Sequence, residues 1–217
     1  MKPVHLFCLL LWGSSSVAVA QAPPLGAFAA LPAMQAPSIS PDGQRLAFIA
    51  QAEGKSFVLV SNIADNKVTA AVDVSVMKPR DLSWTNADTL MLLASETVNF
   101  GAAARQVESF APYGIDLAGD IHVRQLLLAE QRIREASQTF GGTIALQGAQ
   151  LIGFDRAKGL ALFPRREQQS RVLYAVDAKN DRRDELDDDT ANTRTWVVDK
   201  GAKPGFRVEY NAQRDVF

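Results

Sequence analysis

The side chains that could carry out nucleophilic catalysis do not form a catalytic pattern in this sequence. A serine hydrolase elbow needs Gly-x-Ser-x-Gly, because glycine on both sides allows the strained turn that exposes the hydroxyl, and the sequence contains no such segment. A Ser-His-Asp relay needs a histidine, and after the first few residues only His122 is available. The segment Asp120-Ile121-His122-Val123 predicts a strand, so we expect a solvent-facing strand histidine. The sequence therefore predicts no catalytic residue.

The residue types that bind metals and cofactors are also not arranged for that purpose. The one cysteine, Cys8, lies in the N-terminal apolar segment, which export would remove. The exported chain would then have no cysteine for a thiolate metal site or a disulfide. The acidic run Asp184-Glu185-Leu186-Asp187-Asp188-Asp189 lacks the alternation and the glycine of a calcium loop and predicts an exposed loop between repeat units. Phe140-Gly141-Gly142-Thr143 lacks the lysine and the strand-to-helix setting of a phosphate loop and indicates a turn. We expect no metal and no cofactor.

Charge indicates the class of partner. Lys and Arg number 23 and Asp and Glu 24, a formal net charge of −1, so nothing favours nucleic acid. The pairs Arg165-Arg166 and Arg182-Arg183 could face the acidic terminus of a peptide, although such pairs are usually solvated loop ends. The expected partner is a peptide substrate or a protein.

Residues 1–22 form a predicted export signal. Lys2 precedes an apolar segment over residues 4–12, and Ala18-Val19-Ala20 and Ala20-Gln21-Ala22 both fit the small-x-small rule of signal peptidase. The apolar segment is shorter than the roughly 20 residues that a spanning helix needs. We therefore expect a mature chain without a membrane span, periplasmic or secreted in a Gram-negative bacterium.

A hairpin recurs along the rest of the chain. Ser40-Pro41-Asp42-Gly43 predicts a tight turn, and the apolar run over residues 46–50 predicts a strand buried on both faces. Related hairpins surround Asp88, Asp155 and Asp199, at intervals of 46 residues (88 minus 42) and 44 residues (199 minus 155). These intervals fall near the roughly 40–50 residues of a four-stranded propeller blade. The sequence predicts an all-β fold: a partial β-propeller of three antiparallel blades plus the first hairpin of a fourth.

The predicted propeller follows an extended lead-in. The lead-in covers residues 23–36, and the incomplete propeller covers residues 37–217, with blades at about residues 37–76, 80–128, 149–187 and 193–217. The interval from Asp88 to Asp155 is 67 residues (155 minus 88), so extra residues are expected at 95–112 and 129–139, and a helix is predicted over 130–136.

Large side chains before each turn are predicted to pack between blades rather than to stack on a ligand. In each blade one residue stands three positions before the turn aspartate: Ile39, Thr85, Ile152 and Trp196. In the second blade Trp84 lies one position before Thr85. A weak fourth strand of the third blade is predicted near residues 183–186.

Three segments carry a resemblance to a known family. They are residues 40–48 after the lead-in Ala27-Phe28-Ala29-Ala30-Leu31-Pro32, the third strand and turn at residues 113–119, and the blade start at residues 195–201. Together they resemble the N-terminal propeller of exported serine peptidases of the prolyl oligopeptidase family, which includes dipeptidyl and acylaminoacyl peptidases. The last segment departs from the family pattern, because its turn is lengthened as far as Gly205-Phe206-Arg207.

In that family the catalytic Ser, Asp and His lie in a C-terminal α/β-hydrolase domain. The resemblance therefore implies a propeller that gates or binds peptide through its loops, truncated before the hydrolase domain and inactive by itself. The same turn and strand also mark TolB-like periplasmic propellers, which are not enzymes and contact protein partners. A non-functional truncated product is a third hypothesis.

Overall fold

This computed structural model describes residues 33–100, 105–127, 151–167, 170–189, 193–199, 201 and 203–210, all within the unit Pro32–Phe217. The predicted export signal, the lead-in before residue 33, the predicted helix and the Phe140-Gly141-Gly142-Thr143 turn lie outside the described residues.

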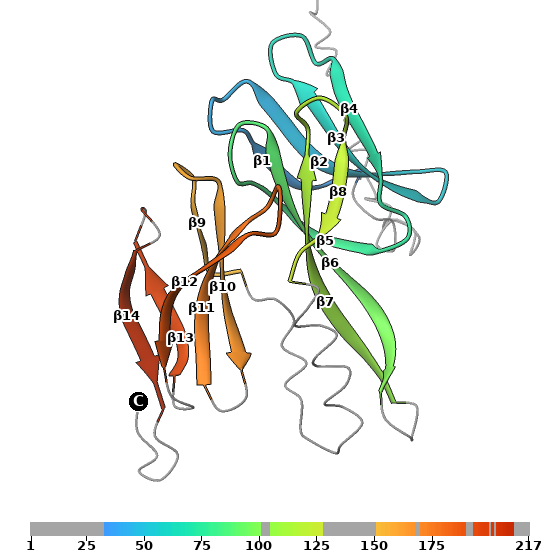
Figure 1. Ribbon diagram of the computed structural model, residues 1–217. Coiled ribbons are helices and arrows are strands. Elements are labelled where there is room, and N and C mark those ends of the chain that lie inside the picture. Colours follow the sequence, from blue (N-terminus) through green and yellow to red (C-terminus); the bar gives the residue numbers. More distant parts are fainter. Residues whose placement is uncertain are drawn as a thin grey trace, which may run out of the picture. The chain divides into compact units, whose positions relative to one another are not determined.

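Every element in the described residues is a β-strand, and the strands form four antiparallel sheets (Figure 1). Three sheets are four-stranded meanders in the orders β1–β4, β5–β8 and β9–β12, here called the first, second and third sheets, and β13–β14 is a hairpin. The all-β fold class with successive four-stranded antiparallel blades is confirmed. The strands are β1 (Met34–Ile39), β2 (Arg45–Ala52), β3 (Lys55–Asn62), β4 (Val68–Asp73), β5 (Lys78–Trp84), β6 (Thr89–Phe100), β7 (Arg105–Asp116), β8 (His122–Gln125), β9 (Gly153–Asp155), β10 (Leu160–Glu167), β11 (Ser170–Asp177), β12 (Arg183–Asp189), β13 (Thr193–Val198) and β14 (Pro204–Glu209).

The turn between β1 and β2 shows why the Ser-Pro-Asp-Gly segment ends one strand and starts the next. The Gly43 N–H donates to the Ser40 carbonyl at 2.9 Å, and Gly43 has φ of 72°, a left-handed conformation that glycine adopts without a steric penalty. The Asp42 carboxylate accepts the Ser40 hydroxyl at 2.5 Å and the Gln44 N–H at 3.1 Å. These two hydrogen bonds, the Ser40 bond first, hold the pKa of Asp42 below its ordinary value.

The same local chemistry recurs at the other turns. An Asp or Asn side chain accepts the backbone N–H two positions later, which fixes the chain reversal within three residues. The residues that do this are Asn62, Asp65, Asn86, Asp116, Asp177, Asn180 and Asp199. Of the aspartates at which the repeat is measured, Asp42 and Asp199 accept such a bond, whereas Asp155 accepts the N–H three positions later. In the second sheet Asn86 accepts the bond in place of Asp88.

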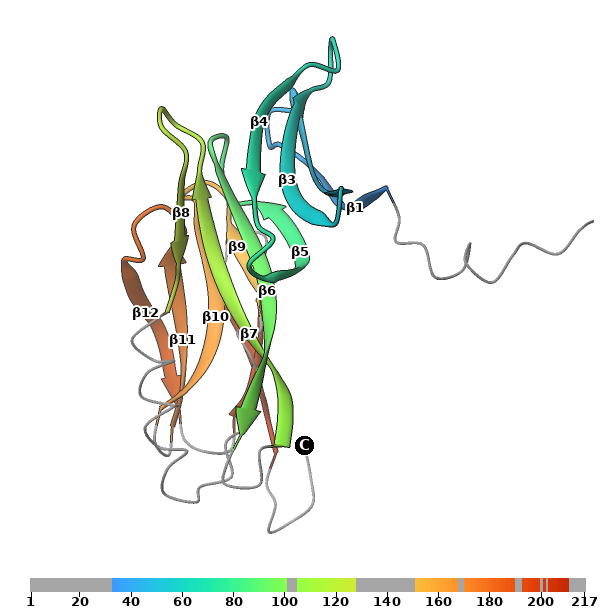
Figure 2. The same ribbon diagram turned by 90° about the vertical axis from the view of Figure 1, so that its right-hand side faces the viewer.

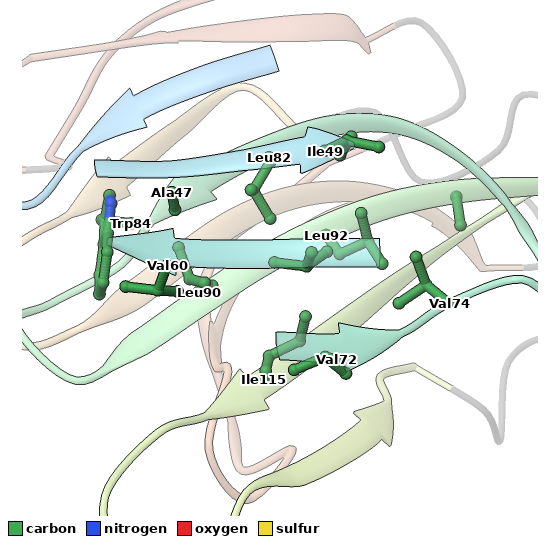
Figure 3. Packing of buried hydrophobic residues seen from close by; sticks show 12 residues of the cluster. Ala47, Ile49, Val60, Val72, Val74, Leu82, Trp84, Leu90, Leu92 and Ile115 are labelled. Carbon is green, nitrogen blue, oxygen red and sulfur yellow. The ribbon is translucent and has the colours of Figure 1, made fainter. Parts of the chain in front are cut away.

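The apolar cores lie between consecutive sheets. Side chains of the first and second sheets point toward one another and form the first cluster (Figure 3). A second cluster joins the second and third sheets, and a third joins the third sheet to hairpin β13–β14. Each sheet therefore packs face to face with the sheet that follows it in the chain, as neighbouring blades do.

Two central strands contribute to two cores at once. In β6, Leu90 and Leu92 belong to the first cluster, whereas Met91 and Leu93 pack in the second. In β10, residues 160 and 162 belong to the third cluster, and residues 161 and 163 to the second. Successive residues of a strand face opposite sides, so a strand between two layers needs the continuous apolar runs seen in the sequence.

Of the extra residues expected at 95–112, residues 95–100 and 105–112 extend β6 and β7 into a two-stranded arm. β6 and β7 pair continuously from Thr89 opposite Asp116 to Phe100 opposite Arg105, beyond the reach of β5 and β8 (Figure 2). The third strand of this sheet therefore starts at Arg105, earlier than the predicted residue 113. The insertion lengthens a hairpin instead of interrupting it, because backbone hydrogen bonds can continue along both strands.

The acidic run at residues 184–189 is a strand, so the predicted loop is wrong and the predicted fourth strand near residues 183–186 is confirmed. It forms most of β12, the edge strand of the third sheet, paired with β11. Acidic residues have low strand propensity, but on an edge strand they face water and discourage pairing with other chains.

Ile39 does not pack between sheets as predicted, because its strand contains an irregularity. The β1 register shifts between Gln35 and Ser38, and Ser38 then lies opposite the buried Ala47. Ile39 consequently lies on the other face and is 60% exposed. The remaining residues of that set follow the prediction: Thr85, Trp84 and Trp196 are buried and Ile152 is half-buried in the third cluster.

Candidate functional site

Trp84 links the first two sheets through a polar contact as well as an apolar one. Its indole is fully buried, and its Nε1–H donates to the Ser38 carbonyl of β1 at 3.0 Å. The Arg45 guanidinium lies 4.9 Å from the centre of the indole ring and 3.1 Å from the Asp88 carboxylate, and it also donates to the Ala87 carbonyl. The guanidinium over the ring adds a cation–π attraction to this junction.

Trp196 makes the corresponding link between the third sheet and the last hairpin. Its indole Nε1–H donates to Asp187 at 2.7 Å, and Arg207 lies 3.8 Å from the same carboxylate. The prediction that both tryptophans fill cores is confirmed. What the sequence did not predict is that each indole N–H also hydrogen-bonds to the preceding sheet.

The second and third sheets meet at an ion pair. Lys179 Nζ lies 3.0 Å from Asp116, whose side chain is only 9% exposed. Burial raises the pKa of Asp116, but the hydrogen bonds from Lys179 and the Ala118 N–H outweigh burial, so the pKa lies below its ordinary value. The charged carboxylate is therefore the form that stabilises this junction.

Backbone contact brings the same two sheets unusually close together. A Cβ at Gly114 would overlap the Ala178 carbonyl oxygen and lie 2.7 Å from its carbonyl carbon. Nearby, the Leu127 N–H donates to Asp181 at 3.0 Å. Burial, the largest effect, raises the pKa of Asp181 above its ordinary value. Only glycine fits position 114 while the sheets keep this separation.

The turns of neighbouring sheets lie along one edge, which we call the turn rim. Arg45 reaches from the start of β2 to the turn before β6, and a Cβ at Gly159, before β10, would lie 2.6 Å from Asn86 of that turn. His122 lies at the start of β8, is exposed as predicted and adds to the positive potential at Asp116. The turn rim carries short, hydrogen-bonded loops, and loops held on a rigid scaffold commonly contact ligands.

The two arginine pairs do not share one environment. Arg165 is buried within β10, so the prediction that its pair forms a solvated loop end is wrong. Arg182 is exposed in the turn before β12, as predicted, and Arg183 is half-buried in β12, 3.7 Å from Asp181. A strand buried between two sheets can hold an arginine when its guanidinium has partners.

A polar cluster lies where the β6–β7 arm leaves the second sheet. Glu108 accepts Lys78 Nζ and the Thr97 hydroxyl, both at 2.7 Å, while its second oxygen lies 3.7 Å from Arg80. Lys78, then Thr97, then Ser95 lower the pKa of Glu108 to about 2. A cavity of about 50 Å³, large enough to hold water, lies on the same sheet and shares Ser95 with this cluster. It is lined by Val76, Met77, Ala94, Ser95, Glu96, Ser109, Ala111 and Tyr113.

Within the described ranges, no three His, Cys, Asp or Glu side chains come together as a metal site requires. The described part of the chain contains no helix long and apolar enough to cross a membrane.

No protein-family model matches this chain, and no curated protein matches it. Several solved structures resemble it at low identity. An acylaminoacyl peptidase in complex with Z-Gly-Gly-Phe-chloromethyl ketone matches with a TM-score of 0.48 and 13% identity, over 79% of this chain and 27% of that chain. The acylaminoacyl peptidase of Pyrococcus horikoshii matches with a TM-score of 0.47 and 12% identity, over 79% of this chain and 27% of that chain.

The hydrazine synthase of Kuenenia stuttgartiensis matches with a TM-score of 0.42 and 16% identity, over 64% of this chain and 39% of that chain. This chain thus spans between 27% and 39% of the length of these three structures. Its structural neighbours include acylaminoacyl peptidase, a prolyl oligopeptidase family member, at low sequence identity.

Proposed function

We propose that this chain is the propeller part of an exported serine peptidase of the prolyl oligopeptidase type. In this proposal the propeller gates or binds peptide while an α/β-hydrolase domain cuts it. The observation that carries the proposal is the stack of four-stranded meanders that begins at Ser40-Pro41-Asp42-Gly43. The segment that builds the first turn is also the segment that carries the sequence resemblance.

The polar side chains at the sheet junctions have a structural role in this proposal. Asp116, Asp187 and Arg45 are each engaged in contacts that join two sheets. A general base or nucleophile must instead be held ready for a substrate. We therefore assign these side chains to the scaffold and propose that peptide contacts the turn rim.

The turn rim offers a direct test of peptide binding. The turn between β11 and β12 lies at the same end of the third sheet as the turn before β10, because the strands are antiparallel, and it therefore belongs to the turn rim. Arg182 is exposed in this turn, which is fixed because the Arg182 N–H donates to Asn180 at 2.8 Å. Arg182→Glu should weaken binding of a fluorescent acidic peptide, measured by anisotropy. Lys55→Glu, the same reversal of charge at the first residue of β3 and at the other end of the first sheet, should leave binding unchanged. Equal effects of both substitutions would contradict binding at the turn rim.

The peptidase assignment is tested separately. We expect an in-frame Gly-x-Ser-x-Gly segment in the coding sequence downstream of Phe217, and a fluorophosphonate probe that labels the product containing it but not the 217-residue chain. Specific labelling of a serine within the 217 residues would contradict the assignment. A downstream sequence without the segment, together with capture of a cell-envelope protein, would favour the TolB-like binding module.

Export is part of the same proposal. The mature chain is expected in the periplasm or medium, and N-terminal sequencing that recovers residues 4–12 would contradict cleavage of the signal.

A further inference from the structure

The cavity of about 50 Å³ in the second sheet lies away from the turn rim. Its walls come from the connection between β4 and β5, which contributes Val76 and Met77, and from the start of the β6–β7 arm. Met77 immediately precedes the first residue of β5, whereas the turn rim follows the last residue of that strand. The cavity is therefore separate from the surface that we propose for peptide binding.

One face of the β6–β7 arm supplies both an apolar wall and a set of oxygen atoms to this cavity. The register pairs Ala94 with Ala111 and Glu96 with Ser109. Because side chains alternate along a strand, these four side chains lie on the same face as Tyr113. Ala94 belongs to the first cluster, so this is the face that meets the first sheet. A carboxylate and the hydroxyls of a serine and a tyrosine thus border an alanine wall.

The Glu96 carboxylate lacks the cations that its neighbour has. Glu108, on the opposite face of the arm, contacts Lys78 and Arg80, whereas Glu96 has no ion pair among the described residues. Burial, and after it the charge of Glu96, raises the pKa of Tyr113, so the carboxylate acts on this hydroxyl. A carboxylate without a cation beside a half-buried hydroxyl attracts a positively charged group.

We propose that this cavity binds the ammonium group of a lysine side chain that a protein partner presents. A lysine ammonium donates hydrogen bonds and accepts none, and the acceptors on this face are the oxygens of Glu96, Ser109 and Tyr113. Lysine also carries an apolar stem, which buries against apolar surface while its charged end stays in a polar setting. Val76, which is 93% exposed, and Met77 supply that apolar surface beside the cavity.

The size and the donor set of the cavity favour lysine over other cations. A water molecule takes up about 30 Å³ of the liquid, so the cavity of about 50 Å³ holds a group of the size of an ammonium and part of its stem. The planar guanidinium of arginine is larger and fits less well. Calcium takes roughly six to eight oxygen ligands, and Glu96 is the only carboxylate among the residues that line the cavity.

The test is an NMR titration of the isotope-labelled full chain with Nα-acetyl-lysine amide. We expect the backbone amide signals of Ala94, Ser109 and Tyr113 to shift together, with a roughly millimolar dissociation constant, because a partly exposed ion pair contributes little free energy. The norleucine derivative has the stem without the ammonium and should not bind. The arginine derivative, which is too large, and methylammonium, which has no stem, should both bind more weakly than the lysine derivative.

Variants of the chain locate the site. Glu96→Gln keeps the shape of the cavity and removes its charge, so it should weaken binding of the lysine derivative by about tenfold. Glu185→Gln, the same change at an exposed position of β12, is the matched control and should leave binding unchanged. Ala111→Val fills the cavity from its wall and should abolish binding. If the spectrum shows that Ala111→Val is not folded, Glu96→Gln, at an exposed position, decides the test.

Several outcomes would overturn the proposal. Equal weakening by Glu96→Gln and Glu185→Gln would show unspecific attraction to surface carboxylates. Binding of the norleucine derivative as tightly as the lysine derivative would show that the cavity recognises the stem alone. Equal binding of the arginine derivative or of methylammonium would show that the cavity does not select lysine. The absence of shifts at the cavity with millimolar lysine derivative would show that it binds no ammonium group.

Discussion

Gly114→Ala should destabilise the protein because it adds one methyl group at the closest approach of two sheets. The new Cβ would lie 2.7 Å from the Ala178 carbonyl carbon and would overlap the oxygen. A Cβ makes an ordinary van der Waals contact with another heavy atom only at 3.4 Å or more. The two sheets must therefore separate by at least about 0.7 Å (3.4 minus 2.7). A gap of this size loses roughly a quarter to a half of the dispersion energy of the contacts that it opens.

The contacts at risk belong to the second cluster, in which Leu126, Leu127 and Ala178 are almost fully buried. Overpacking typically costs about 1–3 kcal/mol, and because the clash is with backbone we expect about 2–3 kcal/mol. For a domain of about 150–250 residues, each kcal/mol lowers Tm by roughly 2–4 °C, so Tm should fall by roughly 4–12 °C.

Thermal and urea unfolding followed by tryptophan fluorescence would measure the effect. Gly205→Ala is the matched control, because a Cβ there would lie 3.6 Å from the Val197 carbonyl, an ordinary contact in a strand. We expect the control to be within about 0.5 kcal/mol of wild type, as surface substitutions usually are. A Gly114→Ala protein as stable as the control would refute the close approach of the two sheets.

Three further predictions follow, two on the junctions between sheets and one on the polar cluster around Glu108 in the second sheet. Trp84→Phe removes the indole donor and leaves the Ser38 carbonyl unpaired, so urea unfolding should show a loss of about 1–3 kcal/mol, and an unchanged midpoint would argue against that hydrogen bond. The pKa of Glu108 is lowered from 4.5 to about 2, so its stabilisation is complete above pH 4.5 and is lost as pH falls toward 2. Acid unfolding of Glu108→Gln should therefore depend less on pH in that window, and an unaltered profile would contradict this sign. Lys179→Met leaves the Asp116 carboxylate without its ion pair. A double-mutant cycle with Asp116→Asn should give a favourable coupling energy between the two side chains at pH 7. A coupling energy of zero would show that solvent screens the pair.

The turns could be predicted from sequence because local chemistry determines them. Gly43 and the Asp42 carboxylate close a turn through contacts within five residues. The apolar runs of β6 and β10 similarly reflect two covered faces. The prediction that β2 is buried on both faces is wrong, because Ala47 and Ile49 are buried whereas Leu46 and Phe48 on the other face are half-buried. The aspartates used to measure the repeat do not all share one role, however: Asp88 pairs with Arg45, and Asn86 accepts the turn N–H in that sheet.

The features that sequence reasoning missed depend on contacts between distant residues. The bulge in β1 turns Ile39 outward, and the residue types of the strand do not indicate a bulge. The same apolar pattern fits either face of the sheet until the register is known. The acidic β12 has poor strand propensity and is held by pairing with β11. Gly114 has no local signature, because the constraint on it comes from Ala178, 64 positions later (178 minus 114).

The division of β6 and β10 between two clusters couples the stability of neighbouring layers. Adjacent residues of one strand belong to different cores, so opening either core exposes a face of the same strand. Such a stack behaves as a row of nearest-neighbour couplings, in which opening free energies rise from the end layers to the middle. Amide hydrogens of β1 and β14 should therefore exchange first and those of β6 and β10 last. A partner bound to one end layer would slow exchange in layers that it never touches.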